Sequence, residues 1–490
     1  MTDIKDGYDV VVVGAGIGGL TCGALLAKNK RSVLVAEQGD RPGGYCASFE
    51  HRGYTFDMGL SHLAGCDLGG AIYETLDELG LRDHIEFIRM KPAIRIVGAD
   101  YDLRVRSVEG LEDRLIELFP METLPIREFI AECKAVSAEA EDMSRKPTEL
   151  MNMWQKVVYV VASLFARRRV AVYGRKSWQE VVEGFFKDPK LRAIAMSIFP
   201  YFEPGVMARL PMAMLGIAQD LYYPGGGAQG LANVLAEAVQ TYGGDLALDT
   251  RVKGITVEEG KAISVSLGDG RQVDARCVVS NVDARQTFLR LIGEEHLSSR
   301  FADKLSKGRL SGSAFIVSLG VKLNLKAMGF DGATIVYNPS DDISELCGAD
   351  PSKCTVWINL HSIIVPSQAW GSTSAVQLVA RLPYDAVDDW NAAEEDVADR
   401  LIASAEQVIP GLSGQIICRH IMSPSTLEQS TSSSQGAVCG WYVAPKVKKR
   451  GQKTPITNLY QAGQWAFPGG GVAAVVTSGR NAAQLVLKGK

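Results

Sequence analysis

Residues 8–37 begin with Tyr8-Asp9-Val10-Val11-Val12-Val13, continue with Gly14-Ala15-Gly16-Ile17-Gly18-Gly19, and close with Ser32-Val33-Leu34-Val35-Ala36-Glu37. A G-x-G-x-x-G spacing is a weak signal by itself. Here it follows a β-branched run, opens a helical pattern, and is followed by an acid at the end of a second β run. This context predicts a β-α-β unit that binds a dinucleotide.

The glycines of this unit have separate physical roles. Gly14 allows a sharp turn after the strand, Gly16 lets the backbone approach the pyrophosphate, and Gly19 lets the helix pack on the strand. The phosphates then meet unpaired N–H groups at the helix N-terminus. We expect Glu37 to accept hydrogen bonds from an adenosine ribose, which disfavours the 2′-phosphate of NADP.

Composition indicates a globular enzyme. The chain has 490 residues, of which 46% are hydrophobic and 22% charged, and a formal net charge of -4 that gives no general attraction for nucleic acid. Its nine cysteines are scattered without a C-x-x-C pair, so we expect reduced thiols, an intracellular compartment and no metal site. The first residues carry no apolar signal core, and we expect no cleaved targeting segment.

A second glycine-rich stretch matches the same spacing at Gly225-Gly226-Gly227-Ala228-Gln229-Gly230. It follows Tyr222-Tyr223-Pro224, which does not read as a β run. We therefore reject it as an NAD site and expect a single dinucleotide.

Three further stretches carry a family resemblance. They are Gly43-Gly44-Tyr45-Cys46-Ala47-Ser48-Phe49 with Gly53–Gly59, Val278–Asp283, and Asn458–Val472 with Ser478–Ala483. Together with the glycine unit they resemble the phytoene desaturase, carotenoid isomerase and retinol saturase family of FAD-dependent oxidoreductases. The resemblance covers the whole chain.

The resemblance implies FAD as the cofactor and assigns its contacts. It places the ADP half on Gly14, Gly16, Gly19 and Glu37, the pyrophosphate and ribityl chain along Gly43 and Gly44, the adenine at the Val252 backbone, and the pyrophosphate also at Gly463. Gly470, Gly471 and Val472 would begin the last helix and direct N–H groups at the flavin ring, where negative charge on the reduced flavin would be stabilised. Gly18, Gln38 and Gln464 complete the predicted set.

The chain departs from the family pattern at two positions. Gln464 stands where many relatives carry an acid, and Tyr45 stands where many carry an arginine. Each change removes one polar contact to the cofactor, which favours loose or exchangeable flavin binding.

The predicted fold is α/β, with a discontinuous Rossmann-like FAD-binding domain of the amine oxidase and phytoene desaturase type. We place this domain at 1–70, 222–292 and 455–490, an α+β substrate domain at 71–106 and 293–454, and a helical, membrane-facing part at 107–221. Within 222–292 the pattern predicts a helix from Leu231 to about Tyr242 and strands at 245–248, 255–257, 262–267 and 272–280.

One helical stretch, 157–166, is uniformly apolar and ends at Arg167-Arg168-Arg169. It is shorter than the roughly 20 residues needed to cross a bilayer. It can dip into one leaflet while the arginines meet anionic head groups, so we expect a peripheral position on the cytoplasmic side of a membrane. The alternative is a buried core helix beside a solvated charge cluster. Lys446–Arg450 would serve the same surface or form a solvated loop.

The chain shows no nucleophile elbow, metal-spaced histidine cluster or Walker loop. Unactivated C–H bonds are too weakly acidic for a side chain to deprotonate first, so a flavin enzyme acting on hydrocarbon would begin with hydride loss to the flavin. The same machinery serves desaturation, cis/trans isomerisation and saturation. The substrate implied by the resemblance is a long isoprenoid polyene such as a carotenoid or retinoid, with a quinone or O₂ as electron acceptor.

The residues after Phe56–Gly59 are expected near the flavin ring, which makes Ser61 and His62 the candidate catalytic residues. His62 would hydrogen-bond the flavin or supply a proton, or would be structural. Four aromatic residues are candidates for lining the substrate site: Tyr201, Phe202, Trp465 and Phe467.

Two alternative functions remain open from the sequence. A flavin amine oxidase would carry a lysine near the flavin and an aromatic cage, and neither can be placed. A prenyl-lipid-binding protein of the GDP-dissociation-inhibitor type would need no flavin, but such proteins have degraded fingerprints, whereas this chain keeps Gly14, Gly16, Gly19 and Glu37.

Overall fold

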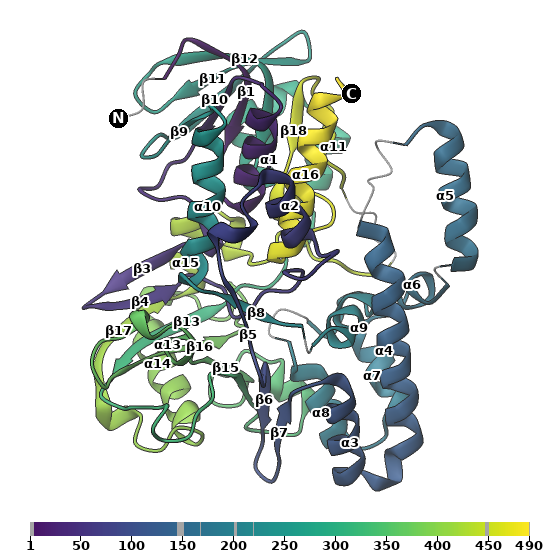
Figure 1. Ribbon diagram of the computed structural model, residues 1–490, viewed down its shortest axis with the longest axis vertical. Coiled ribbons are helices and arrows are strands. Elements are labelled where there is room, and N and C mark those ends of the chain that lie inside the picture. The colour runs from purple at the N-terminus through teal and green to yellow at the C-terminus, as the bar shows by residue number, and fades with distance from the viewer. Residues whose placement is uncertain are drawn as a thin grey trace.

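The computed structural model describes residues 4–144, 151–166, 168–199, 203–218, 220–445 and 450–489. Figure 1 shows three parts: a sheet with helices at the top, a second sheet at the lower left, and a layer of helices on the right. Segments far apart in the sequence meet in each sheet. The mixed α/β class with a Rossmann-like parallel sheet is therefore as predicted.

The first sheet contains five parallel strands in the order β9-β2-β1-β12-β18. Their bounds are β1 Gly7–Val13, β2 Val33–Ala36, β9 Asp245–Ala247, β12 Gln272–Ser280 and β18 Leu459–Gln461. Val10 pairs with Val33 on one side and with Cys277 on the other. Such strands are rich in Val and Ala because a central parallel sheet is buried on both faces.

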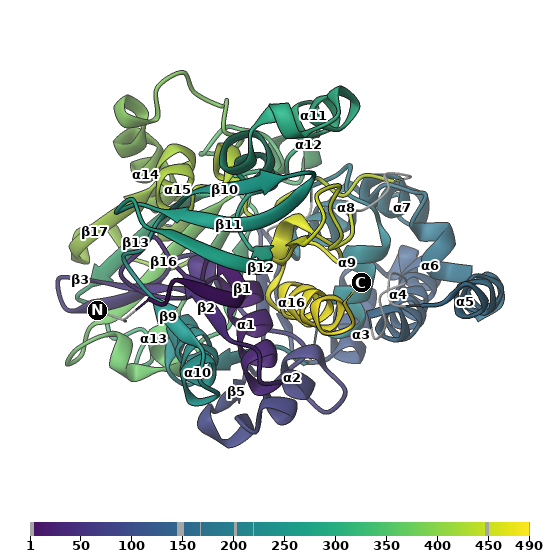
Figure 2. The same ribbon diagram turned by 90° about the horizontal axis from the view of Figure 1, so that it is seen from above.

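Helices cover one face of this sheet and a meander extends it (Figure 2). Helix α1 (Ile17–Lys28) packs between α10 (Gly227–Thr241) and α16 (Val472–Leu487). Strands β10 (Val252–Glu258) and β11 (Lys261–Leu267) continue antiparallel from β12. The four strands expected in 245–280 are thus present.

Helix α10 begins four residues earlier than predicted, at Gly227. The carboxylate of Asp57 accepts the Ala228 N–H at 3.2 Å, and the hydroxyl of Ser48 accepts the Gln229 N–H at 3.2 Å. These partners lie far back in the sequence, so local patterns could not reveal them. The preceding Tyr222–Pro224 is strand β8, contrary to the prediction, but it pairs antiparallel with β5 (Phe87–Arg89) outside the parallel sheet.

The second sheet has the order β17-β13-β16-β15-β14-β6-β7. Its strands are β6 Ile94–Val97, β7 Asp102–Val105, β13 Phe315–Val321, β14 Thr334–Tyr337, β15 Val356–Asn359, β16 Ser374–Ala380 and β17 Ile416–Met422. Every residue of β13 and β16 is buried, and α14 (Trp390–Glu406) packs on this core. A ribbon of β3 (Ser48–His51) and β4 (Tyr54–Asp57) lies between the two sheets, where β4 contacts β16.

The predicted helical part forms α3 to α9. These helices are α3 Val108–Leu118, α4 Thr123–Ser144, α5 Met153–Ala166, α6 Arg168–Tyr173, α7 Trp178–Phe185, α8 Pro189–Ser197 and α9 Arg209–Gly216. In the part of the chain that the structure describes, no helix is long and apolar enough to cross a membrane.

Helix α5 is not the buried core helix that the sequence offered as an alternative. Val157, Val158 and Val161 are 48%, 61% and 50% exposed. The helix projects at the right of Figure 1 beyond α4, so the body of the protein does not cover these side chains. Of the second basic run, Lys446–Lys449 lie outside the described residues.

Candidate active site

A cavity of about 1070 Å³ opens at the carboxyl ends of the parallel strands. Val13, Ala36 and Asn281, at the ends of β1, β2 and β12, line one end of it. Open α/β sheets bind ligands at this edge, where the loops after the strands leave a crevice. The other end reaches the helices α4 and α9.

The glycine loop after β1 forms a narrow cradle in this cavity. Gly14, with φ +94°, lines it together with Gly16 and Gly18. A Cβ on Gly18 would lie 2.8 Å from the Cα of Gly463, so the two loops meet backbone to backbone. Gly19 does not line the cavity. A Cβ there would lie 2.2 Å from the Gly14 carbonyl oxygen, which fits the packing role expected for it.

Glu37, the expected ribose acceptor, is held by two backbone groups. One carboxylate oxygen accepts the Ala15 N–H at 2.7 Å and the other accepts the Gly39 N–H at 2.9 Å. Each oxygen keeps a lone pair for a further donor. The neighbouring Gln38 donates to the Ser432 hydroxyl at 3.1 Å, and both residues line the cavity.

Two helices direct uncapped N-termini at the same cavity. The N-caps of α1 and α16 are Gly16 and Gly471, and neither helix has a side-chain cap. The first N–H groups of a helix need acceptors, and the helix dipole favours a negative one. The cradle, Glu37 and these two ends therefore fit the pyrophosphate, ribose and flavin edge of FAD.

The remaining predicted cofactor residues also line the cavity: Gly43, Gly44, Val252, Gly463, Gln464, Gly470, Gly471 and Val472. Val252 begins β10 at the Glu37 end, and Val472 begins α16 as predicted. The sequence thus places the contacts on three separate segments that the fold brings to one cavity.

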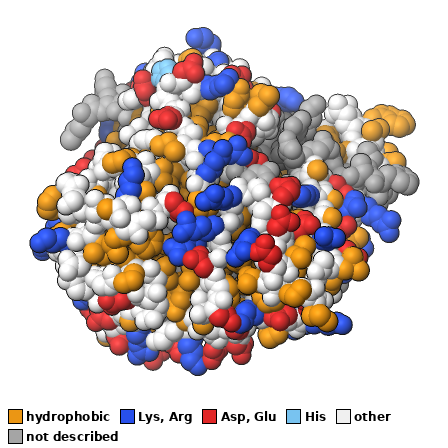
Figure 3. Space-filling model, turned by 60° about the horizontal axis from the view of Figure 1, so that its bottom comes forward, with side chains coloured by type: hydrophobic (Ala, Val, Ile, Leu, Met, Phe, Trp, Pro, Cys, Tyr) orange, Lys and Arg blue, Asp and Glu red, His pale blue; other side chains and the backbone are white. Residues whose placement is uncertain are grey.

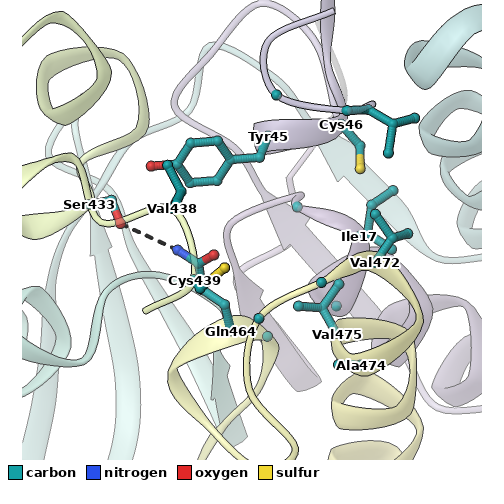
Figure 4. A pocket seen from close by; sticks show the side chains of 18 of the residues that line it. Ile17, Tyr45, Cys46, Ser433, Val438, Cys439, Gln464, Val472, Ala474 and Val475 are labelled. Carbon is teal, nitrogen blue, oxygen red and sulfur yellow. Dashed lines mark hydrogen bonds between the residues drawn. The ribbon is translucent and has the colours of Figure 1, made fainter. Parts of the chain in front are cut away.

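The two residues that depart from the family pattern are bound to protein groups. Tyr45 donates to the Ala437 carbonyl at 3.2 Å, and Gln464 donates to the same carbonyl and to the Ser433 hydroxyl, each at 3.3 Å. In Figure 4 both side chains point to the segment carrying Ser433 and Val438. Burial raises the pKa of Tyr45 to about 12, so its phenol stays neutral.

Two thiols lie on the cavity wall, Cys46 and Cys439. Burial raises the pKa of each to about 12. Since the thiolate is the reactive form, neither is a nucleophile near neutral pH.

Ser61 and His62 both line the cavity, and Ser61 is held by residues at and just after the end of β15. Asn359 donates to the Ser61 hydroxyl at 3.0 Å, and Nε2 of His361 lies 2.9 Å from the Ser61 carbonyl oxygen. Nδ1 of His62 is buried and has no hydrogen-bond partner among the described residues. A buried orphan nitrogen on a cavity wall is suited to a bound ligand.

His62 is neutral near neutral pH. Burial, together with the smaller effect of the nearby His361 imidazole, lowers its pKa to about 4. The expectation that it supplies a proton is therefore weakened, because too little imidazolium exists at pH 7. Its capacity to form a hydrogen bond remains.

Sequence reasoning missed a buried polar cluster behind Ser61. The Asp57 carboxylate accepts from Ser48 at 2.6 Å and from the Tyr223 hydroxyl, while the Tyr223 ring stacks on His361 at 4.0 Å between centroids. Gln368 donates to the Tyr223 oxygen at 2.7 Å. No local signal could have found it, since its members come from distant segments.

The wall that α9 gives to the far arm of the cavity is apolar. Leu210, Ala213 and Met214 of α9 line it, and Ile217 follows them on the same helical face. Ala140 of α4 and Phe199 face the same space. The arm and the cofactor residues line one cavity, so the arm is suited to a hydrocarbon chain.

The predicted lining aromatics have different positions. Trp465 lines the cavity and makes an edge contact with Trp441 at 5.2 Å. Phe467 does not line the cavity, although the next residue, Pro468, does. The N–H of Phe467 donates to the Arg450 carbonyl at 2.7 Å. Tyr201 and Phe202 lie outside the described residues, although Glu203 beside them lines the cavity.

Comparison with known proteins decides the family. The model of flavin-containing amine oxidoreductases matches residues 17–487. The chain belongs to this family. Membership implies FAD, which agrees with the cradle and the two uncapped helices.

Relatives within the family support the predicted resemblance. The chain is 27% identical to a chloroplastic prolycopene isomerase of Arabidopsis thaliana, over 96% of this chain and 81% of that protein. It is 25% identical to a lycopene-forming phytoene desaturase of Pseudescherichia vulneris, over 98% and 99% of the two chains. The chain is thus a flavin oxidoreductase related to carotenoid desaturases and isomerases.

Solved structures show the same fold at lower identity. An oxidoreductase from Methanosarcina mazei has a TM-score of 0.66 at 17% identity, covering 97% of this chain and 99% of its own. A Rab GDI from Plasmodium falciparum has a TM-score of 0.54 at 13% identity, covering 99% of this chain and 97% of its own. These likenesses concern the fold alone. No lysine is among the described residues that line the cavity, so the lysine typical of amine oxidases is still not found.

Proposed function

We propose that this family member uses FAD to change carbon–carbon bonds of a long isoprenoid polyene such as a carotenoid or retinoid. The observation that carries the proposal is the apolar arm along α9, which leads into the same cavity as the uncapped N-terminus of α16. An apolar chain entering by this arm would come to lie against the cofactor. The similarity to prolycopene isomerase and phytoene desaturase supports the same substrate class.

When bound, FAD supplies the hydride or electron transfer that no side chain here can perform. The protein contributes shape and dryness. Leu210, Met214 and Phe199 give the arm an apolar wall, and Ser61 and His62 contribute neutral polar groups to the cavity wall. The N-terminus of α16 stabilises negative charge where the flavin edge would lie.

Three reactions fit this arrangement: desaturation, cis/trans isomerisation and saturation. We infer a quinone or O₂ as the electron acceptor of an oxidative reaction, because the chain carries one dinucleotide fingerprint. The protein would work peripherally on the cytoplasmic side of a membrane, since such substrates dissolve in lipid.

The test is an anaerobic titration of the flavoprotein with liposomes carrying cis and trans polyenes, followed by product chromatography. Bleaching of oxidised flavin with a longer chromophore would identify a desaturase. Product that forms only after prior reduction of the flavin and has an unchanged mass would identify an isomerase. Product that forms under the same condition and has gained two hydrogens would identify a saturase. Amine oxidation without any response to polyenes would refute the proposal.

A variant with a blocked arm tests whether the arm holds the substrate, and a matched substitution at the surface is its control. Ala213→Phe should fill the arm and lower polyene turnover by about tenfold or more while the flavin spectrum is retained. Ala392→Phe, at an exposed site on α14, should leave turnover unchanged. Full turnover in Ala213→Phe would show that the arm does not hold the substrate.

A further inference from the structure

Helix α5 carries an apolar face that no described element covers. Met153 and Trp154 are 79% and 78% exposed, and Val157, Val158 and Val161 are about half exposed. At 100° per residue these five positions fall within an arc of about 140° on one side of the helix. Figures 1 and 2 both show α5 at the edge of the molecule, where it packs against α6.

The same segment has charge of one sign. Residues 151–176 contain six lysines and arginines and no aspartate or glutamate. Lys156, Arg168, Arg175 and Lys176 are exposed and form no ion pair with a described carboxylate. Figure 3 shows hydrophobic and basic side chains together at the right edge, beside atoms that are not described.

Arg169 anchors this segment to the body. Its guanidinium lies 3.1 Å from the Glu132 carboxylate and 3.6 Å from that of Glu139, both on α4. The two glutamates are therefore occupied within the protein. The remaining cations of α5 and α6 are left for an external anion.

A further cation lies behind α6. Arg209, the first residue of α9, is half-buried beside Gly174 and near Tyr159 of α5, and its guanidinium forms no hydrogen bond or ion pair with a described residue. A desolvated cation without a counterion is costly, so such a group is expected to receive an anionic ligand. The next residues of α9, Leu210 and Ala213, already line the apolar arm.

We propose that α5 and α6 dock the protein on an anionic lipid leaflet, with the apolar face of α5 at the acyl boundary and Arg209 taking a lipid phosphate. Exposed apolar side chains beside unpaired cations are the combination that binds such a surface. Since α9 carries both Arg209 and the wall of the arm, the docked surface adjoins the path of a lipid-borne substrate. This last link rests on the proposed function, whereas the docking itself does not.

A second copy of the chain is a poorer occupant. A twofold contact through α5 would set the unpaired cations of one copy against those of the other, with no carboxylate of residues 151–176 to offset them. An anionic leaflet has the complementary charge.

The experiment measures co-sedimentation of the full-length flavoprotein with vesicles of phosphatidylcholine, with and without phosphatidylglycerol, in the absence of polyene. The unaltered protein should bind the anionic vesicles more tightly, and salt should weaken this preference. The double variant W154S/V158S should bind the anionic vesicles more weakly than the unaltered protein, by about tenfold or more. Trp370→Ser, which removes another exposed tryptophan far along the chain, should bind as the unaltered protein does.

The charge variants separate the two parts of the proposal. R175E/K176E should lose about tenfold in binding to anionic vesicles and little to neutral ones. Arg209→Gln should lower the anionic preference, and Arg209→Lys should restore most of it. Flavin spectra confirm folding, and turnover of detergent-solubilised polyene should persist in W154S/V158S, which separates failed docking from a failed proposed function.

Two results would overturn the proposal. Vesicle binding unaffected by W154S/V158S would remove α5 from the interface. A dimer in sedimentation velocity that this variant dissociates, without vesicle binding by either protein, would identify a second copy as the occupant.

Discussion

Individual residues decide whether the cavity can hold a dinucleotide. A Cβ on Gly16 would lie 2.7 Å from the side-chain nitrogen of Asn281 and would enter the cradle. Glu37 is already fixed by two N–H donors, so the expected ribose acceptor is organised before a ligand arrives. Preorganised groups lose little entropy on binding.

Gly16→Val should therefore yield folded protein without flavin, because the added side chain occupies the pyrophosphate position. The measurement is the flavin absorbance of the purified protein together with its far-ultraviolet circular dichroism. Gly184→Val is the control, since a Cβ at Gly184 meets nothing within 4 Å. Retained flavin in Gly16→Val would mean that the cofactor site is misplaced.

The burial of His62 predicts a pH dependence of stability. Its pKa is about 4 in the folded chain, against 6.5 when unfolded, so the unfolded state binds more protons between these values. The free energy of unfolding should fall as pH drops from 6.5 towards 4, by about 3 kcal/mol from this group.

His62→Gln lacks this contribution. Between pH 7 and pH 4.5 the free energy of unfolding should therefore fall more in the unaltered protein than in His62→Gln. Urea unfolding of both apoproteins at the two pH values measures it. A difference that does not change with pH would contradict the buried neutral imidazole.

At the scale of elements, helix starts depend on partners from distant strands. Helix α10 begins at Gly227 because Asp57 and Ser48, from the β3-β4 ribbon, accept its first N–H groups. The same Asp57 accepts from Tyr223 on β8, which stacks on His361 next to the second sheet. One carboxylate thus ties three elements together behind the active site.

Tyr223→Phe should keep the stacking and lose the hydroxyl, leaving Asp57 and Gln368 each short of a partner. We expect a loss of about 1–3 kcal/mol in the free energy of unfolding. Urea unfolding measures the loss, with Tyr73→Phe, on the partly exposed face of α2 (Ala71–Leu79), as a control within about 0.5 kcal/mol of the unaltered protein. Equal stability of both variants would show that the cluster contributes nothing.

For the whole molecule, the cavity joins parts that are far apart in the chain. Its walls come from the glycine loop, the 430–443 segment, α9 and α16, so a ligand filling it binds the folded chain and not the unfolded one. Any such ligand stabilises the fold by mass action.

The thermal midpoint of the apoprotein should therefore rise with added FAD. Free FAD at 100 times its dissociation constant contributes about 2.7 kcal/mol. Differential scanning fluorimetry across an FAD series measures the shift, and the Gly16→Val variant provides the control that should not respond. A midpoint independent of FAD in the unaltered protein would contradict binding at this cavity.

The sequence by itself determined the β-α-β unit, with β runs at 8–13 and 32–37, and the strands of 245–280, because each depends on local spacing of glycines and β-branched residues. The start of α16 was predicted from the family resemblance. Only the tertiary structure decided which residues surround Ser61 and where α10 begins. Asp57, Tyr223 and His361 lie in separate segments, and the hydrogen bond and ring stacking that join them leave no periodic trace in the chain. The tertiary structure also showed that the apolar side chains of α5 are exposed. An apolar run looks the same in sequence whether it lies in the core or at the surface.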